Sequence, residues 1–155
     1  GSWVGPGTGA TQDQMTHKRN IIERSVNINR QGIRRPLEAG MSLGGREQVA
    51  ICGAVVAAKY YSIPVILDGF VCTAAVLPIF FERRDMLDHC LIGHSSKEPG
   101  HKLLLKMLDK DPILNLNMAL GEGSGAALAT SIVKAALKCH VEMATFEDAG
   151  VSSKQ

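Results

Sequence analysis

The chain has 155 residues, of which 45% are hydrophobic and 21% charged, a composition typical of globular proteins rather than disordered ones. Its 17 basic and 15 acidic residues leave a net charge of only +2, which argues against a nucleic-acid-binding protein dominated by charge. No apolar run reaches the roughly 18 residues that predict a membrane-spanning helix. We therefore expect one globular unit that binds neither nucleic acid nor a membrane.

The ends of the chain and its cysteines bear on organisation and compartment. Residues 1–2 have the composition of an expression-vector scar, residues 3–151 form the predicted domain, and residues 152–155 form a tail. No signal peptide is visible.

The cysteines stand alone, without a CxxC pair, which favours buried reduced thiols over disulfides or a metal site. They are Cys52, Cys72, Cys90 and Cys139. We expect a cytoplasmic protein with no metal and no cofactor.

Hydrophobic periodicity predicts alternating helices and strands after a glycine-rich opening loop. A small-residue helix precedes a short apolar run that ends at Asp68-Gly69, the pattern of a buried parallel strand. In the helix that starts at Pro99, leucines and a methionine at 103, 104, 107 and 108 are expected to face inward. The expected elements are helices over 15–29 and 45–61, a strand over 63–67, a helix over 70–81, a weaker strand over 88–93, and helices over 99–110 and 126–143.

This alternation predicts an α/β fold, a three-layer parallel sheet flanked by helices in the Rossmann-like manner. Ligands bind such sheets at the carboxyl ends of the strands. Three polar, glycine-bearing loops fall at expected strand ends or helix starts, around residues 68–69, 95–98 and 121–125. Their coincidence predicts a site at that edge of the sheet.

Two glycine-rich segments have both a functional and a structural interpretation. In Gly121-Glu122-Gly123, neighbours without side chains let a carboxylate reach a bound substrate, whereas the alternative is a loop with a solvated Glu122 and Ser124 as helix cap. The N–H groups around Gly7 can form an anion nest, with Lys18 as a point charge. The alternative there is a terminal loop and a surface lysine.

Several motifs in order are together specific to one family. The chain resembles the nicotinate-nucleotide:dimethylbenzimidazole phosphoribosyltransferases of cobalamin biosynthesis, over nearly its whole length but matching only the C-terminal half of the family's longer proteins. The motifs are Gly7-Thr8-Gly9 with Lys18, Gly44-Gly45-Arg46-Glu47, Pro64 to Phe70, Ser96 to His101, Leu120 to Ala127, Glu142 to Phe146 and Ala149-Gly150-Val151.

The resemblance implies transfer of phosphoribosyl from nicotinate mononucleotide to dimethylbenzimidazole or a related base, giving α-ribazole phosphate and nicotinate. It implies a homodimer and places the catalytic general base at Glu122. Gly7, Lys18 and Ser96 fall on phosphate-contacting positions, and Asp68 and Gly69 fall on positions that line the nucleotide pocket. Leu120 and Gly121 fall beside the bound base.

The sequence also departs from the family pattern. The upstream glycine-rich loop and the N-terminal region that lines the benzimidazole pocket are not in this chain. Ser95 stands where an arginine is usual, and Arg46 replaces an aromatic residue after the paired glycines. Two alternatives therefore accompany the enzyme hypothesis: a catalytically impaired nucleotide- or ligand-binding module, and an oligomerisation domain of the same fold.

Overall fold

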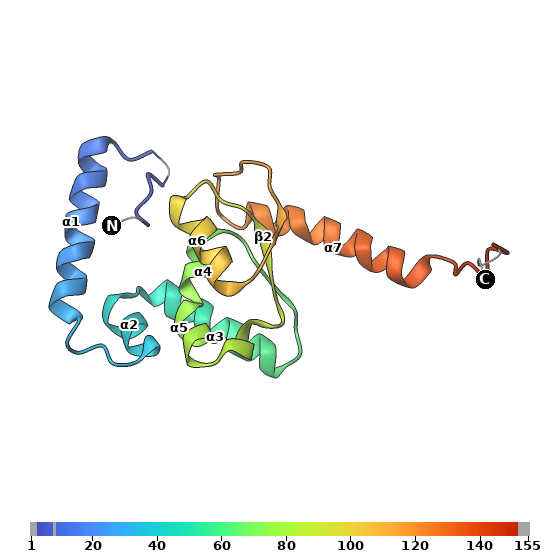
Figure 1. The fold of residues 1–155 in the computed structure, drawn as a ribbon, viewed down its shortest axis with the longest axis horizontal. Helices are drawn as coiled ribbons and strands as arrows, with labels where there is room; N and C mark the ends of the chain where they lie inside the picture. The colour runs from blue at the N-terminus through green and yellow to red at the C-terminus, as the bar shows by residue number, and fades with distance from the viewer. Residues whose placement is uncertain (1–2, 8, 152–155) are drawn as a thin grey trace.

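A computed structural model describes residues 3–7 and 9–151, so the predicted scar and tail lie outside the described residues. The elements are α1 (Gln12–Asn29), α2 (Pro36–Leu43), α3 (Arg46–Tyr60), β1 (Val65–Leu67), α4 (Phe70–Ala75), α5 (Leu77–Glu82), the 3-10 helix η1 (Arg84–Leu87), β2 (Cys90–His94), α6 (Pro99–Leu108), β3 (Pro112–Leu114) and α7 (Ser124–Glu142). A central parallel sheet has helices on both faces, and α1 lies apart from the sheet, against α2 (Figure 1).

The three strands pair in the order β1-β2-β3, and both pairings are parallel. Leu67 lies opposite Ile92, and His94 lies opposite Leu114. All three carboxyl ends therefore meet at one edge of the sheet. The predicted α/β class and parallel sheet are confirmed.

The third strand is absent from the prediction, because the apolar segment over residues 113–120 reads as irregular. Pro112 opens β3, and a strand of three residues gives too short an apolar run for its period to be recognised. Proline is tolerated at the first position of an edge strand, since no ladder bond from its nitrogen is needed there.

The single helix expected over residues 70–81 is two helices. α4 ends at Ala75 and α5 begins at Leu77, with Val76 between them. Pro78 causes the break, because its nitrogen cannot donate to the carbonyl four residues earlier and its ring would clash there. Proline fits instead in the first turn of α5.

A helix that sequence reasoning missed, α2, lies between the helices expected over residues 15–29 and 45–61. Pro36 occupies its first turn, and the Glu38 carboxylate accepts the backbone N–H groups of Arg34 and Arg35. Proline followed by glutamate is a helix-start signal that is available in the sequence. The Arg35 guanidinium also pairs with Glu82 at 2.9 Å, which links the start of α2 to the end of α5.

The buried face of α6 differs from the prediction. Leu103 and Met107 are 48% and 42% exposed, whereas Leu104 and Leu108 are buried as expected. His101 and Leu105 complete the buried face. Positions 101, 104, 105 and 108 form the i, i+3, i+4, i+7 stripe of an amphipathic helix, and this stripe packs against α4.

The hydrophobic core lies between the sheet and helices α3 to α6. On the other face α7 packs against all three strands, and then extends away from the sheet (Figure 1). Every residue from Lys134 to Glu142 is exposed. Leu91 shares a strand face with Gly93, which contacts α7, yet Leu91 is 41% exposed. In the described chain, α7 thus covers only the carboxyl end of this sheet face.

Candidate functional site

The predicted loops do meet at the carboxyl edge of the sheet. Asp68-Gly69 follows β1, and Ser95-Ser96 follows β2. The His94 amide donates to the carbonyl of Asp68 at 3.0 Å, and the Ser95 amide donates to the carbonyl of Leu114 at 2.8 Å. These bonds hold the three strand ends in register where ligands bind in sheets of this kind.

Asp68 links this corner to the glutamate-bearing loop. Its carboxylate Oδ1 accepts the backbone N–H of Ala126, in the first turn of α7, at 2.9 Å. Asp68 is only 9% exposed, so the bond is largely shielded from water. A carboxylate at the N-terminus of a helix is favoured by the unpaired N–H groups and the helix dipole. Two segments that the sequence predicts to share a site are therefore joined directly.

His94 packs beneath the same junction. Its imidazole lies where side chains on Gly69 and Gly125 would be, and it would collide with a β-carbon at either position. Its Nε2 is 3.9 Å from Asp68 Oδ2, and its buried Nδ1 has no hydrogen-bond partner among the described residues. Sequence reasoning assigns no role in the site to His94. Its role is visible only in the structure, where the imidazole packs against Gly69 and Gly125 and so holds the start of α7 close to the end of β1.

Glu122 has a backbone conformation that favours glycine. Its φ angle is +57°, between Gly121 at +80° and Gly123 at +78°, so three successive residues are left-handed. A left-handed side-chain-bearing residue is strained, and such strain is common at active sites. The Glu122 side chain is exposed. Leu120, which the resemblance places beside the bound base, is 71% exposed.

The start of α7 differs from the alternative interpretation of this loop. Gly123 is the N-cap residue and has no side chain to cap the helix, and the Asp68 carboxylate accepts the N–H of Ala126 instead. The Ser124 hydroxyl is instead buried without a partner in the described part of the chain. Ser124 is therefore not a helix cap.

The N-terminal glycine loop lies against the start of α6. The Gly7 amide donates to Glu98 Oε1 at 2.9 Å, and Lys18 Nζ donates to the carbonyl of Gly5 at 3.3 Å. The hydroxyl of Ser96 accepts the amide of Glu98 at 3.2 Å. The structure thus gathers Gly7, Lys18 and Ser96, the three predicted phosphate contacts, around one short turn. Glu98 is the residue in this arrangement that sequence reasoning leaves without a role.

His101 is fully buried beside this turn. Its Nδ1 accepts the amide of Ser96 at 2.9 Å, which leaves the proton on Nε2. Burial, with a smaller contribution from the charge of His94, lowers the pKa of His101 to about 4. His101 is therefore neutral at pH 7 and serves as an acceptor that fixes the Ser96 backbone.

The cysteines match the prediction of buried reduced thiols only in part. Cys90 is buried, and burial raises its pKa to about 11, which makes this thiol unreactive. Cys139 is exposed on α7, so the expectation of buried cysteines is wrong at that position. Within residues 3–7 and 9–151, no three His, Cys, Asp or Glu side chains cluster in a way that could hold a metal ion. No helix of the described chain has the length and apolar character needed to cross a bilayer.

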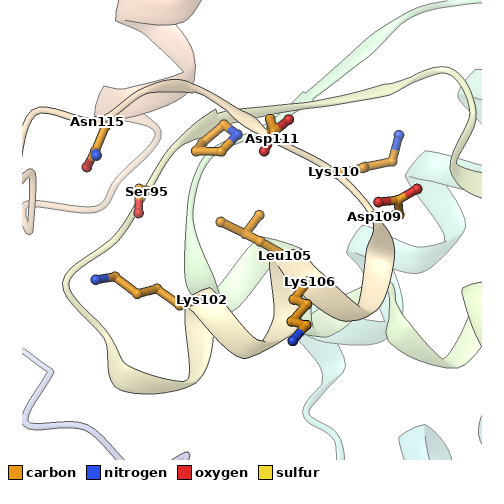
Figure 2. A pocket seen from close by; sticks show the side chains of 9 residues that line it. Ser95, Lys102, Leu105, Lys106, Asp109, Lys110, Asp111 and Asn115 are labelled. Carbon is orange, nitrogen blue, oxygen red and sulfur yellow. The ribbon is translucent and has the colours of Figure 1, made fainter.

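Two hollows lie outside this site. The first, of about 410 Å³, lies between α6 and the β3 segment, with lysines and aspartates around Leu105 and Pro112 (Figure 2). The second, of about 730 Å³, is an apolar groove between helices α2 to α5. Ser95, in the predicted loop over residues 95–98, lines the first hollow, whereas the residues whose roles the resemblance implies line neither. The candidate site is therefore an open edge of the sheet rather than an enclosed cavity.

The parallel sheet and the glycine-rich polar loops at its strand ends place the chain among the α/β proteins in which ligands bind at the carboxyl ends of the strands. A family model described as phosphoribosyltransferase matches residues 1–151, and the chain belongs to this family. The resemblance drawn from the sequence motifs is confirmed.

Named relatives agree with this assignment. The nicotinate-nucleotide--dimethylbenzimidazole phosphoribosyltransferase of Brucella canis is 50% identical over 153 residues, which is 99% of this chain and 45% of the relative. The corresponding protein of Brucella anthropi is 49% identical with the same coverage. The crystal structure of CobT from Thermus thermophilus superposes with a TM-score of 0.90 at 39% identity, over 99% of this chain and 45% of that one. The chain thus spans about half the length of the relatives it matches.

Proposed function

We propose that this chain forms the part of a phosphoribosyltransferase that carries the general base and the phosphate contacts. The reaction transfers phosphoribosyl from nicotinate mononucleotide to dimethylbenzimidazole or a related base. It yields α-ribazole phosphate and nicotinate, a step in assembling the lower ligand of cobalamin. The observation that carries the proposal is the strained left-handed Glu122, on a loop that Asp68 ties to the strand ends.

The chemistry requires one proton acceptor. A benzimidazole nitrogen attacks the anomeric carbon of the ribose, and the bond from that carbon to the nicotinate nitrogen breaks. Nicotinate leaves from a pyridinium, so it needs no proton. The attacking heterocycle loses its N–H proton, and the Glu122 carboxylate accepts it. The exposure of Glu122 lets the acceptor ring lie directly against it, and the bound ring then excludes water from the carboxylate.

Phosphate binding falls to the other end of the site. The backbone around Gly7, Lys18 and Ser96 come from three segments that the fold brings together. The Lys18 ammonium and the Ser96 hydroxyl offer donors, while the Gly7 N–H is bonded to Glu98. Asp68 and Gly69, at the corner between them and Glu122, face the nucleotide. Leu120 and Gly121 lie beside the base. In this arrangement the phosphate anchors the substrate while the ribose reaches the glutamate.

The proposal includes a homodimer in the cytoplasm. The second half of α7 exposes Leu137 and Val141, 60% and 69% accessible, which a second subunit can cover. Light scattering after size exclusion tests this, and a monomer at all concentrations contradicts it.

The test of the function uses the complete gene product that contains this chain. It is incubated with nicotinate mononucleotide and dimethylbenzimidazole, and α-ribazole phosphate and nicotinate are followed by mass spectrometry. Stoichiometric formation of both products supports the proposal. Calorimetric binding of the nucleotide without product after long incubation indicates a binding module, and the absence of any binding indicates an oligomerisation domain.

A further inference from the structure

The proposed phosphate contacts come from segments that are far apart in the sequence. Gly7 lies in the N-terminal loop, and Ser96 lies 89 positions later, between β2 and α6. Donors on separate loops bind an anion together only if something fixes the distance between them. The loop is short of side chains, so its own residues offer few groups for this purpose.

Glu98 makes the connection. Its Oε1 accepts the Gly7 amide at 2.9 Å, while Oε2 lies in the space where a side chain on Gly5 would be. The Glu98 amide in turn donates to the Ser96 hydroxyl. One residue therefore contacts both the loop and the serine, and it does so because position 5 is a glycine.

The opposite side of the loop is held as well. Lys18, from α1, donates to the carbonyl of Gly5, two residues from the amide that Glu98 accepts. Next to it, Val4 is buried, and Trp3 packs against the core and against Gly100 in the first turn of α6. The loop is thus fixed between α1 and α6 by its backbone.

We propose that Glu98 is a positioning residue for phosphate binding: its carboxylate accepts the Gly7 N–H and holds the Gly5–Gly7 backbone against the start of α6, so that Lys18, bonded to the Gly5 carbonyl, and Ser96 address the same phosphate. The inference rests on the proposed function and extends it to a residue in a predicted site loop to which the sequence assigns no role. Both carboxylate oxygens are turned toward the loop, so Glu98 acts through Gly7 and does not itself bind the nucleotide. A competing role, an internal anion that blocks the Gly7 amide, predicts an effect of opposite sign.

The experiment compares the unaltered chain with Glu98→Ala, Glu98→Gln and Gly5→Ala. Glu23→Ala, which removes the same charge from an exposed position on α1, is the control. Calorimetry gives the Kd for nicotinate mononucleotide. Trp3 is the chain's one tryptophan, so its emission reports whether the loop stays docked on α6. Thermal unfolding shows that each variant folds.

We expect Glu98→Ala to raise the Kd about tenfold, the size expected from losing one charge-assisted hydrogen bond, and to shift Trp3 emission to the red. Gly5→Ala should do the same, because its side chain collides with the carboxylate. Glu98→Gln keeps an oxygen that accepts the Gly7 amide, so its Kd should stay within about threefold. Glu23→Ala should change neither quantity.

An unchanged or lower Kd in Glu98→Ala overturns the inference, and a lower one indicates the blocking role. If neither the unaltered chain nor the complete gene product binds the nucleotide, the proposed function fails on its own. In that case the wavelength of Trp3 emission still tests whether Glu98 holds the loop. An unchanged wavelength in both Glu98→Ala and Gly5→Ala refutes the positioning role of Glu98.

Discussion

Glu122 carries a side chain at a position whose backbone favours glycine. Replacing it by glycine relieves the left-handed strain, so the free energy of unfolding should stay constant or rise by about 1 kcal/mol. Product formation by the complete gene product should nevertheless fall to background. Urea denaturation and the product assay, run side by side, check this. Ser62→Gly is the matched control, since Ser62 also has a positive φ, of 58°, and lies outside the site. Parallel loss of stability and activity in Glu122→Gly would assign Glu122 a structural role.

Because His101 is buried in its neutral form, the free energy of unfolding should fall as the pH is lowered. Burial lowers its pKa from 6.5 to about 4, so the unfolded chain binds more protons than the folded one between these values. The stability contributed by neutral His101 is complete above pH 6.5 and is lost as the pH falls toward 4. The thermal midpoint should therefore drop across this window.

The variant His101→Leu tests the assignment. It loses the acceptor for the Ser96 amide, so it should be less stable at pH 8 by about 1–3 kcal/mol. Its thermal midpoint should, however, fall less steeply between pH 6.5 and 4. An identical slope in both proteins would show that another group is responsible.

At the scale of elements, the site depends on how closely α7 approaches the strand ends. Gly125→Ala would place a methyl group against the His94 ring. We expect a loss of about 1–3 kcal/mol in unfolding free energy, in the range measured for overpacked cores. Chemical denaturation measures it, and nucleotide binding should weaken in the same variant.

The control for this variant is Gly53→Ala. Gly53 lies inside α3, where an added β-carbon meets no other atom within 4 Å. Because alanine is the better helix former, this variant should gain about 0.5–1 kcal/mol. Equal responses of the two variants would mean that the fit between His94 and Gly125 does not position α7.

Element by element, prediction succeeds where the pattern is long or sharply ended. The helix over residues 15–29 is predictable because its polar and apolar residues have a clear period, and β1 because Asp68-Gly69 ends it. The break at Val76 escapes prediction because an unbroken apolar run hides it, and β3 escapes prediction because three residues are too few to show a period. The periodicity of α6 predicts its inward face only in part, because five apolar residues, Leu103 to Leu105, Met107 and Leu108, lie on adjacent sides of the helix.

In the candidate site, too, features with a local sequence pattern are predictable and contacts between distant segments are not. The loops around residues 68–69, 95–98 and 121–125 are predictable, because glycines and polar residues follow apolar runs there. The bond from Asp68 to Ala126 and the contact of Glu98 with the N-terminal loop are not. They join residues 58 and 91 positions apart, and no local pattern encodes such pairings.

At the scale of the whole molecule, the chain presents an open site. Glu122 and Leu120 are exposed, and α7 leaves part of one sheet face uncovered. Catalysis of this kind requires exclusion of water around the reacting atoms. The 155-residue chain by itself should therefore turn over far more slowly than the full-length Brucella canis relative, of which it matches 45%. Equal kcat/KM for the two in one assay would contradict this view of the site.

The measurement that bears most directly on the central claim is the rate of α-ribazole phosphate formation by the complete gene product and its Glu122→Gln variant. Glutamine keeps the size of the side chain and removes the proton acceptor. We predict a fall in kcat of about 10²- to 10⁴-fold, the usual contribution of a general base, with little change in the Kd for nicotinate mononucleotide. Glu23→Gln, on the exposed face of α1, should retain full activity. A Glu122→Gln enzyme that makes the product at the unaltered rate would contradict the account.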